Sequence, residues 1–148
     1  MSSKYSRVCA EIDMDAIAEN FRIMHEAIHP ETKMVAVIKT DGYGHGAVPI
    51  AQMIQPEDYI WGFATATAQE ALQLRRAGIR KPVLVIGLVF EEYYEKLVEN
   101  EIRMAVCDYE TARKFDEAAK KKGKKGLIHL AVDTGMTRIG FKDYKECL

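Results

Sequence analysis

Short apolar segments separated by longer amphipathic ones are the feature that most limits how this chain can fold. The apolar segments are residues 8–12, 34–39, 59–64, 82–86, 103–106 and 127–132. Most are continuous apolar runs rather than alternations of apolar and polar residues, a pattern typical of parallel strands that are covered on both faces. Parallel strands need helical connections between them, so the sequence predicts an α/β fold.

The segments between the predicted strands show helical periodicity and helix-end signals. Helices are expected at residues 14–28, 47–54, 67–77, 91–99 and 109–122. Asp13 and Asp108 stand where N-cap residues belong, and Gly78 and Gly123 stand where helices commonly end. This alternation is compatible with an open doubly wound sheet or with a barrel, and periodicity alone does not decide between them.

Composition and missing signatures exclude several classes of function. No G-x-G-x-x-G motif follows a predicted strand and no P-loop pattern occurs, which argues against a nucleotide-binding fold. With 21 basic and 22 acidic residues, the chain lacks the basic excess of nucleic-acid-binding proteins. Its three cysteines are widely spaced, which indicates neither a disulfide framework nor a metal site. Without a signal peptide or a long apolar run, we expect no membrane contact and a cytoplasmic location.

Two polar clusters directly follow predicted strands, where barrel enzymes carry their active sites. Lys39 ends an apolar run and opens a glycine-rich turn, and Arg138 lies in residues 133–141 after the last strand. A partly desolvated lysine amine suits covalent chemistry with a carbonyl, although a solvated strand-end charge is the simpler alternative. An arginine offers a planar fork to a carboxylate, phosphate or phenolate, although a surface ion pair is the alternative for Arg138. Together the clusters indicate a site for an anionic, carbonyl-bearing ligand.

At these clusters the chain resembles the alanine racemases, which are fold-type III pyridoxal-phosphate enzymes. AVIKTDGYGHG at residues 36–46 is similar to the family's cofactor-lysine signature, and DTGMTRIGF at residues 133–141 is similar to a second family segment. Residues 10–17, 62–65 and 70–79 also match, so the resemblance runs along nearly the whole chain. It implies that residues 1–148 are the N-terminal portion of a (β/α)₈ TIM-type barrel. About five strand–helix units are expected, without the C-terminal units and the β-rich domain.

The resemblance also implies roles for individual residues. Lys39 would bind pyridoxal 5'-phosphate covalently and serve as one of two acid/base groups at the substrate Cα. Tyr43 would donate to the cofactor phosphate, with packing on the turn glycines as the alternative. Arg138 would lie near the cofactor's phenolic oxygen and the substrate carboxylate. Ala131 occupies a position where some members carry a carbamylated lysine that holds this arginine, so support for Arg138 either comes from elsewhere, such as a bound anion, or is absent.

The reaction implied by the resemblance is the interconversion of L- and D-alanine by a homodimer, which supplies D-alanine for peptidoglycan. A racemase needs a base on each face of the substrate. The tyrosine that the family uses on the opposite face is not among these residues, so we expect the chain alone to be inactive. A serine or broad-specificity racemase, a related aldolase or decarboxylase, and a non-catalytic pyridoxal-phosphate-binding protein remain alternatives.

Two histidines near these clusters are interpreted as structural. His45 lies between two glycines of the turn and is expected to fix it by hydrogen bonding. His129 lies in the last predicted strand and is expected to line the core or the barrel.

Overall fold

The computed structural model describes residues 8–147, which divide into two compact units between Thr32 and Lys33. The first unit contains helix α1 (Met14–Glu26), and the predicted N-cap Asp13 accepts the N–H of Ala16 at 2.9 Å. The strand predicted at residues 8–12 is wrong, because these residues adopt no strand conformation in the structure. A short apolar run becomes a strand only where a neighbour accepts its backbone hydrogen bonds.

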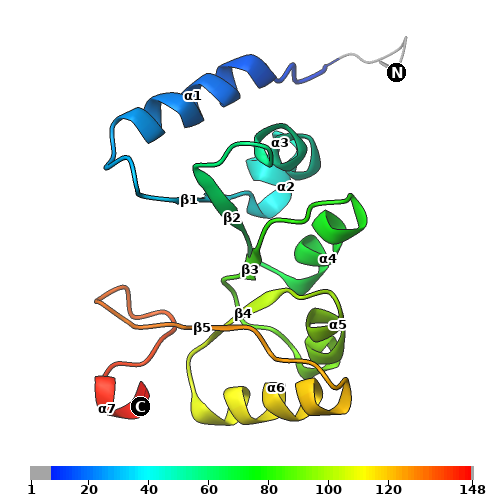
Figure 1. Ribbon diagram of the computed structural model, residues 1–148, viewed down its shortest axis with the longest axis vertical. Coiled ribbons are helices and arrows are strands. Elements are labelled where there is room, and N and C mark those ends of the chain that lie inside the picture. The colour runs from blue at the N-terminus through cyan, green and yellow to red at the C-terminus, as the bar shows by residue number, and fades with distance from the viewer. Residues whose placement is uncertain (1–7, 148) are drawn as a thin grey trace. The chain divides into compact units, whose positions relative to one another are not determined.

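The second unit is built on a sheet of five parallel strands (Figure 1). The strands are β1 (Met34–Val37), β2 (Ile60–Thr65), β3 (Val83–Val85), β4 (Arg103–Val106) and β5 (Ile128–Leu130). Their spatial order is their order in the chain. A doubly wound sheet reverses this order at a switch point, whereas a barrel keeps it. The strands thus follow the order of a barrel, and the sheet is not closed. The predicted α/β class and five-unit partial barrel are confirmed.

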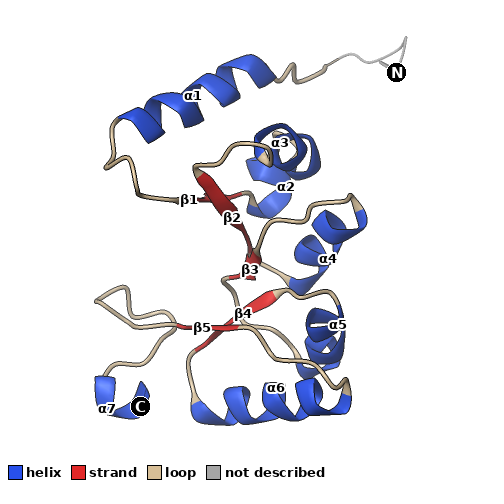
Figure 2. Cartoon of the chain, viewed as in Figure 1, coloured by secondary structure: helices blue, strands red, loops and turns tan. Residues whose placement is uncertain are grey.

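Helices fill the connections between these strands and lie along one side of them (Figure 2). They are α2 (Lys39–Tyr43), α3 (Ala47–Ile54), α4 (Ala68–Arg76), the short 3₁₀ turn η1 (Glu91–Tyr93), α5 (Tyr94–Glu99) and α6 (Tyr109–Lys121). Helix α7 (Tyr144–Cys147) follows β5 and belongs to no connection between strands. The predicted N-cap Asp108 accepts the N–H of Thr111 at 2.8 Å. Gly78 and Gly123 follow α4 and α6 with φ of 85° and 61°, as predicted for glycines just beyond helix ends. Helices α2 and α7 were not predicted from the sequence.

The core lies between the sheet and these helices. Along β4, Met104 and Val106 are buried while Arg103 and Ala105 are only partly covered, because one face of the strand packs on helices. Phe63 of β2 is fully buried. Apolar burial of this kind contributes about 25 cal/mol per Å². The helix-covered face therefore carries most of the stability of this unit.

The other face of the sheet gathers a polar and aromatic cluster. The guanidinium carbon of Arg103 lies 5.0 Å from the centroid of the Trp61 ring, and the rings of Trp61 and His129 are 5.7 Å apart. Burial, and next the charge of Arg103, lower the pKa of His129. His129 therefore lines the inner face of the open barrel. Across residues 8–147, no helix has the length and apolar character needed to cross a bilayer.

Candidate functional site

Residues that follow four of the five strands line one pocket of about 410 Å³. They are Lys39 after β1, Ala66 after β2, Ile86, Gly87 and Leu88 after β3, and Arg138 and Ile139 after β5. All of these segments leave the carboxyl ends of parallel strands, and these ends lie at one edge of the sheet. The fold thus brings Lys39 and Arg138, from the two polar clusters of the sequence, into one cavity. Its volume suits a small organic molecule.

Lys39 is held at the end of β1. The N–H of Ile38 donates to the carbonyl oxygen of Ala64 at 2.9 Å, so pairing with β2 continues to the residue before Lys39. The side chain of Lys39 is half-buried, and its Nζ lies 5.0 Å from the centroid of the Tyr43 ring. Tyr43 is 58% exposed and does not belong to the pocket lining. The structure thus places Tyr43 beside Lys39 rather than inside the cavity.

The glycine-rich turn after Lys39 is one turn of left-handed helix. Thr40, Asp41, Gly42 and Tyr43 have φ of 54°, 51°, 63° and 56°, and Gly44 follows with 84°. Each non-glycine residue in this conformation costs about 1–2 kcal/mol. The glycines of the motif predict a turn, but they do not predict that three other residues adopt the same conformation. Such strain persists only where surrounding contacts hold it.

Side chains within the turn supply part of that support. Asp41 Oδ1 accepts the N–H of Ala47 at 2.9 Å, at the start of α3. His45 Nδ1 lies 3.2 Å and 3.1 Å from the carbonyl oxygens of Gly42 and Tyr43. A carbonyl oxygen can only accept, so Nδ1 carries a hydrogen here. The prediction that His45 fixes the turn by hydrogen bonding is confirmed.

Glu70 of α4 supplies a further contact that sequence reasoning missed. Its Oε1 accepts the N–H of Thr40 at 2.7 Å, and its Oε2 accepts those of Ala66 at 2.8 Å and Thr67 at 3.1 Å. Thr67 and Glu70 form a capping box, which the T-x-x-E spacing signals in the sequence. That spacing predicts the bond to Thr67 but carries no information about Thr40, which lies 30 residues earlier.

The loop that carries Arg138 is organised by Asp133. Asp133 Oδ1 accepts the N–H of Thr137 at 2.9 Å and that of Gly135 at 3.0 Å. These bonds, with that of Thr137 the larger, hold the pKa of the Asp133 carboxyl below its ordinary value. Within residues 8–147, no hydrogen bond or ion pair to the Arg138 guanidinium is found. The guanidinium can therefore serve an anionic ligand.

Phe141 closes the same loop back onto the end of the sheet. Its N–H donates to the carbonyl oxygen of Ala131 at 2.8 Å, and its carbonyl accepts the N–H of Asp133 at 2.9 Å. Gly140 permits this approach, because a Cβ at that position would lie 2.6 Å from the Asp133 nitrogen. The loop is therefore anchored at both ends, on either side of Arg138.

A second glycine allows the walls of the pocket to meet. A Cβ on Gly87 would lie 2.3 Å from the carbonyl oxygen of Ala66. Only glycine lets these two segments run so close together. The side chains of Ile86, Leu88 and Ile139 make the remaining lining largely apolar.

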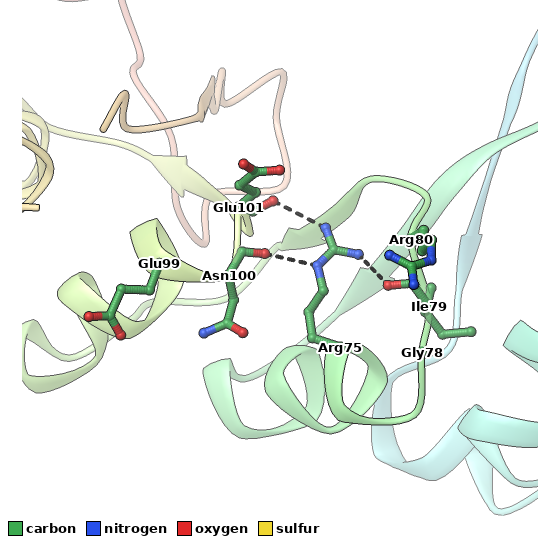
Figure 3. A pocket seen from close by; sticks show the side chains of 7 residues that line it. All are labelled: Arg75, Gly78, Ile79, Arg80, Glu99, Asn100 and Glu101. Atoms are coloured by element: carbon green, nitrogen blue, oxygen red, sulfur yellow. Dashed lines mark hydrogen bonds between the residues drawn. The ribbon is translucent and has the colours of Figure 1, made fainter. Parts of the chain in front are cut away.

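A larger hollow of about 460 Å³ lies where α4 and α5 end, before β3 and β4 begin (Figure 3). Its main cation, Arg75, donates to the carbonyl oxygens of Asn100 at 2.9 Å, Ile79 at 2.8 Å and Glu101 at 3.1 Å. Burial lowers the pKa of Arg75. Because its donors are occupied by backbone carbonyls, Arg75 joins the α4–β3 and α5–β4 connections rather than serving a ligand. The amino-terminal edge of a barrel sheet typically serves stability.

Comparison with known proteins agrees with this arrangement. The family model described as "Alanine racemase, N-terminal domain" matches residues 12–148. The alanine racemase of Methanococcus maripaludis is 42% identical over 139 residues, covering 94% of this chain and 37% of the relative. That of Clostridium perfringens is also 42% identical, over 95% of this chain and 36% of the relative.

Solved structures show the same relationship. The alanine racemase of Clostridium difficile 630 matches with a TM-score of 0.90 and 37% identity, over 95% of this chain and 36% of that one. A histidine racemase from Leuconostoc mesenteroides matches with a TM-score of 0.86 and 28% identity, over 98% of this chain and 38% of that one. The chain thus spans a little over a third of the length of these relatives. It belongs to the alanine racemase family.

Proposed function

We propose that this chain forms the lysine-bearing part of the active site of an amino-acid racemase that uses pyridoxal 5'-phosphate and interconverts L- and D-alanine. One observation carries the proposal: an amine, Lys39, and a guanidinium, Arg138, line the same pocket at the carboxyl edge of the sheet. The relatives of similar sequence are named alanine racemases, which favours alanine as the substrate.

The pocket residues fit this cofactor by their chemistry. An aldehyde needs a nucleophilic amine, which Lys39 supplies. A phenolate or carboxylate needs a cation, and the guanidinium of Arg138 is free of other partners within the described residues. An aromatic ring needs apolar walls, which Ile86, Leu88 and Ile139 supply. The donor to the phosphate is less well matched, because the side chain of Tyr43 is mostly exposed. It would have to act at the edge of the cavity, beside Lys39.

In the proposed reaction, the bound cofactor acts as an electron sink that makes the substrate Cα proton removable. Lys39 Nζ takes or returns that proton on its own face of Cα. Arg138 binds the substrate carboxylate and so orients the Cα–H bond. The apolar side chains of Ile86 and Ile139 cover part of the pocket beside Lys39 and reduce its contact with water. A second base on the opposite face is required. We propose that it comes from the partner subunit of a homodimer, outside these 148 residues.

A broader substrate range is a second candidate. The structural relative from Leuconostoc mesenteroides is named a histidine racemase, so similar folds accompany different substrate names. Leu88, which lines the pocket, is 69% exposed, and the cavity is therefore open on that side. Serine and larger amino acids belong in any test of specificity.

The test of the proposal is covalent capture of the cofactor. The chain is mixed with pyridoxal phosphate and reduced with borohydride, and the modified lysine is located by peptide mass spectrometry. We expect labelling at Lys39, its loss in Lys39→Ala, and full labelling in Lys125→Ala, which removes an exposed lysine elsewhere. Equal labelling of the parent chain and Lys39→Ala would refute the assignment of Lys39.

Catalysis is measured separately from binding. Chiral chromatography of L-alanine incubated with the loaded chain reports D-alanine, and serine and histidine are assayed in parallel. We expect labelling at Lys39 without D-alanine from these 148 residues, because we place the second base outside them. Formation of D-alanine would show that these residues contain both bases. A cytoplasmic location stays a prediction from the sequence.

A further inference from the structure

The carboxylate of Glu70 joins the two backbone segments that flank the pocket. On one side it accepts the N–H of Thr40, the residue after Lys39, at 2.7 Å. On the other it accepts the N–H of Ala66, which lines the pocket, at 2.8 Å, and that of Thr67 at 3.1 Å. One half-buried side chain therefore bridges the ends of β1 and β2.

These contacts act where the backbone is strained. Thr40 is the first residue of the left-handed turn, with φ of 54°. Hydrogen bonds to an ionised acceptor are about twice as strong as neutral ones. The negative charge of Glu70 also lies in the first turn of α4, where the helix dipole favours it. Glu70 is therefore well placed to hold Thr40 against relaxation toward an ordinary turn.

We propose that Glu70 is a positioning residue. Through the amide of Thr40, it fixes the backbone of Lys39, and so it sets where Nζ meets a carbonyl carbon in the pocket. Glu70 does not touch the reacting atoms. This inference rests on the proposed function, because it assumes that Lys39 is the reacting amine. In that reaction the neutral Nζ adds to the aldehyde carbon, and water leaves as the C=N bond forms.

The variant Glu70→Gln tests the proposal with little change in shape. Its amide keeps one acceptor oxygen and replaces the other with an NH₂ donor, which cannot accept from a backbone N–H. The remaining oxygen keeps more hydrogen bonds by facing Ala66 and Thr67 than by facing Thr40, so we expect the Thr40 bond to be the one that is lost. Thr67→Ala is the matched control, because it removes the hydroxyl that accepts the Glu70 N–H at 3.3 Å and leaves the carboxylate in place. Both variants weaken the same helix end.

Two measurements separate positioning from general stability. The first is the equilibrium constant for attachment of pyridoxal phosphate to Lys39, from borohydride trapping at graded concentrations. We expect a decrease of about tenfold in Glu70→Gln and less than about twofold in Thr67→Ala. The second is hydrogen exchange of the Thr40 amide without cofactor. We expect it to be about tenfold faster in Glu70→Gln and unchanged in Thr67→Ala.

The outcomes are distinguishable. Unchanged attachment in Glu70→Gln, with attachment abolished in Lys39→Ala, overturns the positioning role and leaves the proposed function standing. Equal losses in Glu70→Gln and Thr67→Ala also overturn it, because they reflect the stability of α4 alone. Attachment that survives Lys39→Ala overturns both. If Glu70→Gln does not fold, Glu70→Asp replaces it. Its carboxylate is one methylene shorter, and attachment equal to that of the parent chain would then refute the role.

Discussion

Replacing Gly87 with alanine tests whether close backbone contact shapes the pocket. The new Cβ would lie 2.3 Å from the carbonyl oxygen of Ala66, whereas real Cβ atoms essentially never come within 3.0 Å of another atom in this way. The segments after β2 and β3 must therefore separate by at least the difference, 0.7 Å. Since the obstacle is backbone rather than a flexible side chain, no rotamer change relieves it.

Two opposing effects set the magnitude. Forced overpacking typically costs about 1–3 kcal/mol. Alanine also has fewer backbone conformations than glycine in the unfolded chain, which stabilises the folded state by about 0.4–1 kcal/mol. We expect the clash to dominate, and the free energy of unfolding to fall by about 1–2 kcal/mol. With a urea dependence of about 2 kcal/mol per M, the unfolding midpoint should drop by about 0.5–1 M.

Urea unfolding followed by fluorescence of the single tryptophan, Trp61, measures this change. Hydrogen exchange of the Ile86 amide, which donates to the Thr65 carbonyl oxygen at 2.9 Å, reports the local displacement. The control is Gly123→Ala, where no atom lies within 4 Å of the added carbon and only the positive φ is strained. It should leave Ile86 exchange unchanged. A Gly87→Ala chain that is as stable as its parent, or more stable, would refute the reasoning. The clash would then cost no more than the stabilisation that alanine gains from the smaller entropy of its unfolded chain.

Three further predictions follow from other parts of the unit. Folding lowers the pKa of His129 below its ordinary value of 6.5. Below pH 6.5 the unfolded chain therefore binds more protons at this residue than the folded chain does. The free energy of unfolding should therefore fall as the pH drops from 7 to 5. The slope should be smaller than the roughly 1.4 kcal/mol per pH unit that uptake of one whole proton would give, because solvent screens this partly open site. His129→Gln should flatten the profile, and an unchanged slope would contradict this cause. Asp133→Ala should speed exchange of the Gly135 and Thr137 amides severalfold in mass-resolved exchange; unaltered protection would show that other contacts hold the loop. The edge strand β5 exposes the side chain of Leu130, which is 51% accessible, so the chain should self-associate as its concentration rises. Leu130→Lys should lower the molar mass measured by light scattering toward that of a monomer. A parent chain that is already monodisperse as a monomer would exclude this association.

Much of the fold could be predicted from local sequence. Helix α6 begins at the residue after Asp108, because that carboxylate caps its first turn wherever the helix is placed. Helix α3 has the bounds predicted from its apolar spacing. Lys39 and Arg138 were identifiable as candidates because each follows a continuous apolar run. These signals are local, since a cap, a helical period and an apolar run each span only a few residues.

The failures share a different cause. The apolar segment at residues 8–12 reads as a strand, but strand formation depends on a neighbour that the sequence does not reveal. The left-handed conformation of Thr40, Asp41 and Tyr43 runs against their intrinsic preference. Contacts from elsewhere in the chain support it, among them the bond from Thr40 to Glu70. No pattern within the motif could show that partner.

The sequence by itself determined the five strands and the helices α3 to α6 in the unit from residue 33 onward, and which two cations could carry chemistry. Only the tertiary structure decided the order of the strands, the open sheet, and the meeting of Lys39 and Arg138 in one pocket. It also decided that Glu70 braces the turn beside Lys39. The physical reason is range. Apolar periodicity and capping act over one or two turns of chain, whereas strand pairing and long-range hydrogen bonds exist only after distant segments have met.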